Sequence, residues 1–443
     1  MKVNYFEITD ILVFVLWIVI LTIVANSISA KYNENEIKKY FLPAYGFKVF
    51  MALVFAIIYI VYFGGGDTTA YWEGANTLNK LLFQNPNFFW EQLVSDPTEE
   101  LRVKHFSKDT GFPPGWIYRE KEAWFVCKIT TFISLLTFRS YLAATVIFAF
   151  TIFLISFKLF EVILKFKTHS IGKVAFAFLF MPSLAFWCSG VSKDTLTYWS
   201  ILVMIFIFLK YFVLKEKLLF IHVLMLFLSF FIIYNTRVFI LAATIAPLLM
   251  AYGTRLTKKY EKSPLAKFSI RMIIIGGGFS FFLIFLGSGF ASELVNEAQI
   301  IQQDFQNNPT YTGKRYEVNT TDASPTGLLK VMPISVFYGI FKPLPYESIS
   351  PTLLLNGIES AILIYFAFIF ITRLVKNIRL ISRNEFLVFS LFFVVFIGFM
   401  AGFSSVLYGV LVRIRAPLLP FVFLLLTIKE LNINSVMENK EKE

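Results

Sequence analysis

The chain has 443 residues, of which 57% are hydrophobic and only 16% are charged, with a formal net charge of +12 and a mean hydropathy of +0.68. A water-soluble domain needs about 25% charged residues to face solvent, so this composition excludes an ordinary soluble protein and indicates one embedded in lipid. Three scattered histidines and two cysteines lack metal-ligand spacing, which argues against a zinc site. The basic residues lie mainly in short loops between apolar segments, so they indicate membrane topology rather than nucleic-acid binding.

Apolar runs of about 20 residues, the length that crosses a bilayer, recur along the whole chain. We therefore predict an all-α, polytopic transmembrane bundle of about 11 spans. The predicted spans lie near residues 8–28, 44–63, 141–163, 174–190, 195–212, 218–235, 238–253, 269–290, 353–373, 385–403 and 411–428. No basic stretch precedes the first span and no small-residue exit follows it, so we expect no cleavable signal.

The lysines and arginines of the loops set the predicted orientation. With the N-terminus outside, the inner loops and the tail hold 24 of the 41 basic residues. Twelve of the other 17 lie in two long outer loops, 64–140 and 291–352, where the positive-inside trend is weak. We predict an N-out/C-in topology, with 1–428 as a single transmembrane domain and 429–443 as a disordered cytoplasmic tail.

Each long outer loop contains an apolar piece too short to span the membrane. Residues 125–138 predict an interfacial helix in the membrane plane. Residues 331–341 predict a re-entrant or surface helix, and the segment Lys342-Pro343-Leu344-Pro345 follows it.

The first candidate residues follow the second predicted span. Asp67 comes directly after Gly64-Gly65-Gly66, which lets the backbone turn sharply, and Tyr71 and Glu73 follow within two helical turns. Asp67 is either the N-cap of the next helix or a reactive carboxylate at the outer boundary, and the two interpretations are compatible.

A second group of candidates consists of charged residues at the outer ends of predicted spans. Lys193 and Asp194 lie in a tight hairpin, where they require pairing or a wet cavity; the alternative is a snorkelling lysine beside an N-capping aspartate. Arg237, Arg413 and Arg415 lie outside against the charge trend. One such arginine is often a snorkelled anchor, but three favour a site for phosphate or pyrophosphate.

Several familiar motifs do not occur in the sequence. It has no Walker loop, no GxGxxG fingerprint, no HExxH and no GxSxG. This excludes P-loop ATPase, Rossmann and serine-hydrolase chemistry.

The outward aspartate after an early span, followed by a large outer loop, resembles the C-type glycosyltransferase superfamily. The segments FMPSLAFWCSGVSKDTL, FKPLPYE and YGVLVRIRAPLLP are similar to parts of bacterial membrane proteins linked to surface-polysaccharide assembly. The resemblance covers most of the chain as a pattern of low specificity. It departs from the superfamily in that the large loop follows the second span and no paired acidic motif accompanies Asp67.

The resemblance implies a multi-pass protein of the bacterial cytoplasmic membrane that uses a polyprenyl-phosphate-linked sugar donor. Asp67 would be the general base, Arg413 or Arg415 would hold the donor phosphate, and the outer loops would admit the acceptor. An enzyme of the O-antigen-polymerase type fits the last arginines equally well. The resemblance assigns no certain cofactor, although a divalent cation is compatible with the chemistry. Two other classes stay open: a transporter or flippase for an anionic lipid-linked glycan, and a structural subunit of a membrane complex.

Overall fold

The computed structural model describes residues 5–33, 35–257, 260, 263–287, 316, 318, 324–348, 350–405 and 407–428. The regular secondary structure of these residues is helical, and no β-strand is assigned among them, which confirms the all-α fold class. Most of the predicted outer loop 291–352 and the whole predicted tail 429–443 lie outside the described residues.

Eight helices of the described chain are long and apolar enough to cross a membrane. They are Ile8–Ser29, Glu36–Tyr62, Tyr141–Leu164, Lys193–Val213, Val238–Thr257, Leu353–Thr372, Glu385–Ser404 and Tyr408–Leu426. The three remaining predicted spans coincide with shorter apolar helices, Ile171–Trp187, Phe220–Thr236 and Phe268–Ile284. The helical membrane character is therefore supported, whereas the number of 11 spans and their orientation stay predictions.

The helices divide into two compact units, each formed by separate stretches of the chain. Unit 1 comprises residues 1–158, 184–203 and 224–238, and unit 2 comprises residues 159–183, 204–223 and 239–443. Most residues of the following helices belong to unit 1: α1(Ile8–Ser29), α2(Asn35–Lys38), α3(Phe41–Ile57), η1(Ile58–Tyr62), α4(Asp67–Gln84), α5(Pro86–Val94), α6(Glu99–His105), α7(Gly115–Arg119), α8(Lys121–Leu136), α9(Tyr141–Leu164), α11(Pro182–Trp187), α12(Lys193–Ile207) and α13(Phe220–Thr236). Unit 2 contains α10(Ile171–Ala175), η2(Phe176–Phe180), η3(Phe208–Val213), α14(Val238–Thr257), α15(Pro264–Gly287), α17(Pro325–Phe341), η5(Pro345–Glu347), α18(Pro351–Thr372), α19(Leu374–Ile381), α20(Glu385–Ser404), α21(Tyr408–Arg415), η6(Ala416–Leu418) and α22(Leu419–Leu426).

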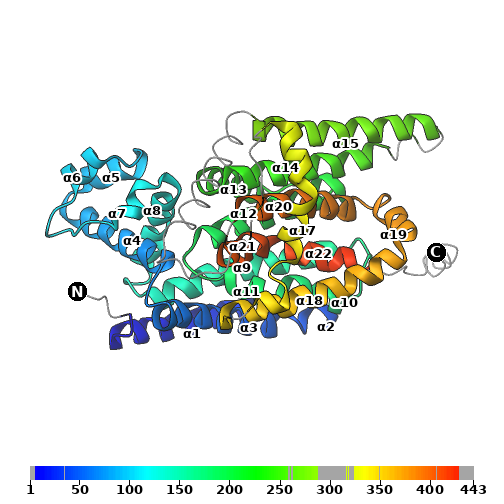
Figure 1. The fold of residues 1–443 in the computed structure, drawn as a ribbon. Coiled ribbons are helices and arrows are strands. Elements are labelled where there is room, and N and C mark those ends of the chain that lie inside the picture. Colours follow the sequence, from blue (N-terminus) through cyan, green and yellow to red (C-terminus); the bar gives the residue numbers. More distant parts are fainter. Residues whose placement is uncertain are drawn as a thin grey trace. The chain divides into compact units, whose positions relative to one another are not determined.

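In unit 1, the predicted outer loop 64–140 forms a group of five helices, α4 to α8, at the left of Figure 1. The apolar piece near 125–138 lies in α8, as a helix was predicted there. Trp124 and Cys127 of α8 are fully buried and share a hydrophobic core with Tyr71 and Trp72 of α4. Because α8 packs on α4 in this way, protein side chains cover much of the apolar side of α8.

In unit 2, α17 packs closely against α20 through small residues. A Cβ on Gly402 would run into the carbonyl oxygen of Ser335, and one on Gly339 would run into the carbonyl oxygen of Gly398. Small residues spaced four apart, Ser335 with Gly339 and Gly398 with Gly402, let two helix backbones approach closely, which is the usual contact between helices in lipid. Helix α17 begins at Pro325, earlier than the predicted apolar piece.

One predicted span is not a single regular helix. Residues 174–190 contain the π-helical turn η2, a break at Met181 and then the short helix α11. Proline at position 182 carries no backbone N–H and cannot continue the hydrogen-bond ladder of the preceding turn. A hydropathy pattern alone misses such a break because the residues on both sides are apolar.

Candidate functional site

Asp67 occupies the first turn of α4, immediately after a sharp reversal of the backbone. Gly64, Gly65 and Gly66 have φ angles of +68°, +127° and +144°, which residues with a side chain rarely adopt. The apolar helix that ends in η1 can therefore turn directly into α4. The carboxylate of Asp67 is half-buried at this junction.

The structure corrects the interpretation of Asp67 as the N-cap of α4. The N-cap residue is Gly66, and its backbone N–H donates to Oγ1 of Thr69 at 3.0 Å. The Thr69 hydroxyl in turn donates to the Gly66 carbonyl at 2.9 Å. Because the threonine closes the helix start, the capping of α4 does not require the Asp67 carboxylate, although a carboxylate in the first turn also suits the helix dipole.

The two other candidates on α4 have different environments. Tyr71 is 3% exposed and belongs to the core of unit 1. Glu73 accepts a hydrogen bond of 3.0 Å from the hydroxyl of Tyr5. Burial, and then the negative charge of Glu73, raises the pKa of Tyr5 above its usual range, so this tyrosine stays a proton donor to Glu73. Tyr71 therefore contributes packing, whereas Glu73 presents a polar group held by the N-terminal segment.

Arg237 and Asp194 form a close ion pair in unit 1. Arg237 is the single residue between α13 and α14, and its Nη2 lies 2.7 Å from Oδ1 of Asp194 in the first turn of α12. Their side chains are only 14% and 2% exposed. In the predicted anion site this guanidinium was expected to face a phosphate, but in the structure it already faces a carboxylate.

Lys193 also has an acidic partner, and this partner is much more exposed to solvent than Asp194. Its Nζ lies 2.8 Å from Oε2 of Glu120, whose side chain is 58% exposed. The positive charge of Lys193 also acts on Cys127, where it opposes the rise in thiol pKa that burial causes. Since Cys127 packs against α4, Lys193 lies within electrostatic range of the α4–α8 group.

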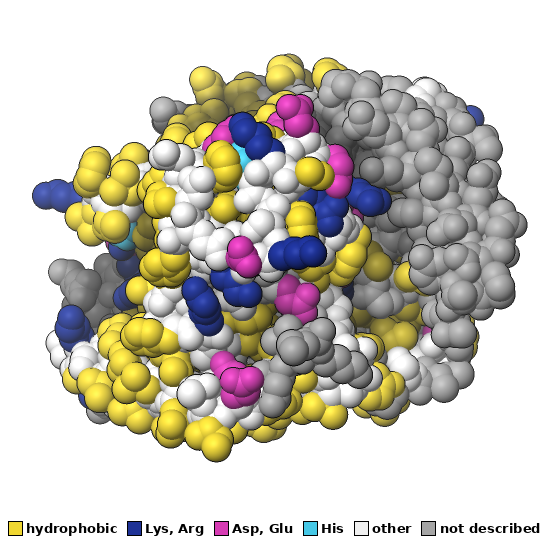
Figure 2. All heavy atoms as spheres, turned by 90° about the vertical axis from the view of Figure 1, so that its left-hand side faces the viewer, with side chains coloured by type: hydrophobic (Ala, Val, Ile, Leu, Met, Phe, Trp, Pro, Cys, Tyr) yellow, Lys and Arg dark blue, Asp and Glu magenta, His cyan; other side chains and the backbone are white. Residues whose placement is uncertain are grey.

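Exposed charges of both signs gather on the face of unit 1 that Figure 2 presents, over α4 to α8. They include Lys121 and Asp96, which pair at 2.9 Å, and Glu99, which pairs with the partly buried Arg102 at 2.8 Å. Such a mixed face is suited to water rather than to lipid acyl chains. That residues 64–140 lie outside the hydrocarbon layer stays a prediction, since the same helices also expose apolar side chains such as Trp90 and Val94.

In unit 2, Arg415 is fully buried and bound by protein groups. Its guanidinium donates to the carbonyl oxygens of Ile340, Lys342 and Asn356 and, at 3.0 Å, to Oγ of Ser360. These contacts tie α21 to the end of α17 and to α18. Arg415 thus acts as a structural clamp, while its predicted partner Arg413 is half-buried in the same helix.

Sequence reasoning assigned no role to Lys342, which lies at the centre of a second polar cluster in unit 2. Its Nζ is 2.9 Å from Oε1 of Glu347 and 3.2 Å from the hydroxyl of Tyr408. The rings of Tyr316, Tyr338 and Tyr408 surround this ammonium with centroids 5.7, 4.5 and 5.6 Å away. A lysine between an apolar helix and two prolines was a visible signal, and Tyr338 lies one helical turn before it, but Tyr316 and Tyr408 are distant in sequence.

Among the described residues, no group of three or more His, Cys, Asp or Glu side chains is placed to hold a metal ion. Comparisons with models of protein families, with curated proteins and with solved structures return no match to this chain. The fold and the site therefore define the class of the protein only as far as a helical protein with eight candidate membrane spans.

Proposed function

We propose that the protein is a membrane glycosyltransferase of the bacterial cytoplasmic membrane, acting on its non-cytoplasmic face in surface-glycan assembly. The donor is a sugar linked to polyprenyl phosphate or pyrophosphate. The observation that carries the proposal is Asp67: a half-buried carboxylate at the glycine turn between an apolar helix and a water-suited helical group, at a helix start that Thr69 caps.

In this reaction the acceptor hydroxyl loses its proton to the Asp67 carboxylate. The acceptor oxygen forms a bond to the anomeric carbon of the donor sugar, and the bond from that carbon to the phosphate oxygen breaks. The electron pair leaves with the lipid phosphate, which is already an activated leaving group, so no nucleotide is needed. A positioned general base contributes about 10²–10⁴-fold to the rate.

A cation near the departing phosphate completes the scheme in unit 1. Lys193 suits this role better than Arg237, because its partner Glu120 is exposed and surface ion pairs are weak enough for a phosphate to displace. The Arg237–Asp194 pair is largely desolvated, so we assign it to positioning the start of α12. The other predicted phosphate ligands, Arg413 and Arg415, belong to unit 2 and are not part of this scheme; both Nη atoms of Arg415 donate to protein oxygens.

The test compares Asp67→Asn, Asp67→Glu and Asp109→Asn in cells that lack the native protein. Asp109 is an exposed aspartate between α6 and α7 and serves as the matched control. We expect lipid-linked glycan precursors, measured by mass spectrometry, to accumulate in the deletion strain and with Asp67→Asn, and to clear with Asp109→Asn. Asp67→Glu should clear them in part. Normal product with Asp67→Asn at equal membrane abundance would exclude Asp67 as the base.

The same chemistry extends to a polymerase, in which the acceptor is itself a lipid-linked oligosaccharide. Chain-length analysis of the surface glycan separates the two cases. Short, single-unit products in the deletion strain would indicate a polymerase, and a missing sugar would indicate a transferase.

A transporter or flippase for an anionic lipid-linked glycan is the second candidate, because unit 1 holds a buried cation at an interrupted helix. Lys48 of α3 is buried and donates to the carbonyl oxygens of Ala185 at 3.2 Å and Cys188 at 2.9 Å, at the end of α11. Interrupted helices with charged residues are typical of transport sites. A transporter would leave the precursor chemically complete but confined to one leaflet, and Asp67→Asn would not alter its composition.

A further inference from the structure

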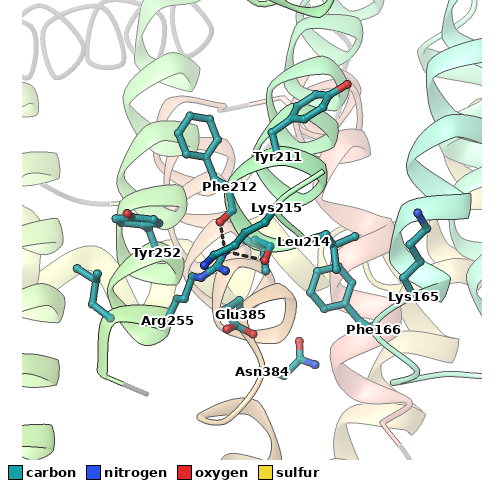
Figure 3. A pocket seen from close by; sticks show the side chains of 12 residues that line it. Lys165, Phe166, Tyr211, Phe212, Leu214, Lys215, Tyr252, Arg255, Asn384 and Glu385 are labelled. Carbon is teal, nitrogen blue, oxygen red and sulfur yellow. Dashed lines mark hydrogen bonds between the residues drawn. The ribbon is translucent and has the colours of Figure 1, made fainter. Parts of the chain in front are cut away.

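Unit 2 contains a pocket of about 780 Å³ that the proposed glycan chemistry does not use. Figure 3 shows Arg255 and Tyr252 of α14 on one side, Phe212 and Lys215 at the end of η3, and Lys165 just after α9. Asn384 and Glu385 at the start of α20 complete the floor. All of the lining residues belong to unit 2.

The pocket lies where four candidate membrane spans begin or end. The spans Tyr141–Leu164, Lys193–Val213 and Val238–Thr257 end beside it, and Glu385–Ser404 begins in its wall. A pocket bounded by the ends of four membrane spans would lie at the level of lipid headgroups. The loops around it are among the basic ones that were predicted to face the cytoplasm.

The charged lining favours an anion. It contains three cations, Lys165, Lys215 and Arg255, and one carboxylate, Glu385. Arg255 donates through Nη1 to the carbonyl oxygens of Phe212 and Val213, which fixes its guanidinium at the pocket and leaves Nε and Nη2 without another hydrogen bond among the described residues. Lys165 is engaged by Glu216 at 2.6 Å, so Arg255 and Lys215 are the principal anion ligands.

Lys215 reaches the pocket from a strained backbone. Its φ of +59° lies in the left-handed region, which costs free energy for any residue other than glycine. Glutamate at position 216 points its charge to Lys165 and Lys210 instead of to Lys215. Lys215 is exposed and lines the pocket, and it has no acidic partner among the described residues.

The pocket also has an apolar edge, which a simple ion would not use. Phe212 is 52% exposed and Tyr252 is 40% exposed beside the two cations. An amphiphile with a phosphate and acyl chains matches both parts, since basic pockets between spans on the cytoplasmic side are suited to anionic lipid headgroups.

We propose that this pocket binds the phosphate of an anionic membrane phospholipid, with Arg255 and Lys215 on the phosphate and Phe212 and Tyr252 along the first carbons of the chains. The inference does not depend on the glycosyltransferase proposal, because none of the residues assigned to that chemistry lines the pocket.

The test uses the purified full-length chain in a neutral detergent, with phosphatidylglycerol, phosphatidylcholine or inorganic phosphate added. Bound lipid is counted by native mass spectrometry. Lys215→Gln and the double variant Lys215→Gln/Arg255→Gln are compared with Arg379→Gln, an exposed cation on α19 outside the pocket.

We expect phosphatidylglycerol to bind in preference to phosphatidylcholine. Its apparent affinity should fall about fivefold in Lys215→Gln and further in the double variant, with no change in Arg379→Gln. Added salt should weaken the difference. Equal binding of the two lipids, or equal losses in Arg379→Gln, would overturn the proposal. Displacement of bound lipid by millimolar inorganic phosphate would instead assign the pocket to a free anion. Lys215 is exposed, so its variant reports on binding even if loss of Arg255 prevents folding.

Discussion

Two arginines, one in each unit, are held in different surroundings: Arg237 is partly buried and Arg415 is fully buried. In unit 1, Arg237 is neutralised by the carboxylate of Asp194 at 2.7 Å. In unit 2, Arg415 is surrounded chiefly by carbonyl and hydroxyl oxygens, whose dipoles stabilise its charge, and Glu359 of α18 adds an electrostatic contribution. The first arrangement needs a partner of opposite charge, while the second needs several backbone segments in fixed positions. The first arrangement is a local ion pair, whereas the second joins α21 to the end of α17 and to α18.

The largest expected effect is the loss of the clamp in Arg415→Met. The substitution leaves the carbonyls of Ile340 and Asn356 and the hydroxyl of Ser360 buried without their donor. We expect a loss of about 3–5 kcal/mol of stability, because a buried charge network loses its centre. Thermal unfolding followed by size-exclusion chromatography in detergent measures it. Arg413→Met, half-buried on the same helix, is the control and should unfold close to the native protein. A stable but inactive Arg415→Met protein would instead assign Arg415 to the substrate.

The next largest loss of stability is expected when the Arg237–Asp194 ion pair of unit 1 is broken. Arg237→Met and Asp194→Asn each leave a largely desolvated partner, and we expect either to lower stability by about 3 kcal/mol. The double variant Arg237→Met/Asp194→Leu removes both charges and should be milder than either single change. A double-mutant cycle of melting temperatures measures this coupling. Additive losses would show that the pair is not coupled. Lys193→Met, which breaks the exposed contact with Glu120, should cost less than about 1 kcal/mol.

The smallest effect is a pH dependence in the Lys342 cluster of unit 2. Burial of Glu347 favours its neutral form, but hydrogen bonds from the Leu344 N–H and from Lys342 outweigh it and hold the pKa below the usual 4.5. A lowered folded-state pKa stabilises the protein above the unfolded value, and this stability is lost as the pH falls through the folded-state pKa. We expect a decline of about 1 kcal/mol or less below pH ~4.5, seen as a lower melting temperature. Glu347→Gln should be less stable at neutral pH and should lack this component of the decline. An identical pH profile in the variant would contradict the assignment.

Hydropathy predicted the helices well because lipid imposes one simple requirement on every span: about 20 apolar residues whose backbone groups bond to one another. The break between α13 and α14 was predicted from the separate apolar runs 218–235 and 238–253, and Arg237 lies there in the structure. The interruption at Met181 was not predicted, because an apolar composition does not reveal a lost hydrogen-bond ladder.

The residues of the candidate site could likewise be predicted from the sequence only in part. Asp67, Glu73, Lys193, Asp194 and Arg237 could be selected from the sequence, because charged residues near spans are rare and costly. Their partners could not be selected. Glu120 is 73 residues from Lys193, and Tyr5 is 68 residues from Glu73. The cluster around Lys342 was missed for the same reason, because Tyr316 and Tyr408 are distant from this lysine in sequence.

The sequence by itself determined that this protein is helical and suited to lipid, and it determined where charge interrupts the apolar runs. Both follow from local composition, since transfer from water to lipid is summed residue by residue. Only the tertiary structure decided which charge meets which partner. In the structure Arg415 donates to oxygens of neighbouring helices, Arg237 pairs with Asp194, and Arg255 lines a pocket. The same side chain had three outcomes because the energy of a charge depends on the dipoles and charges that the fold brings within a few ångströms.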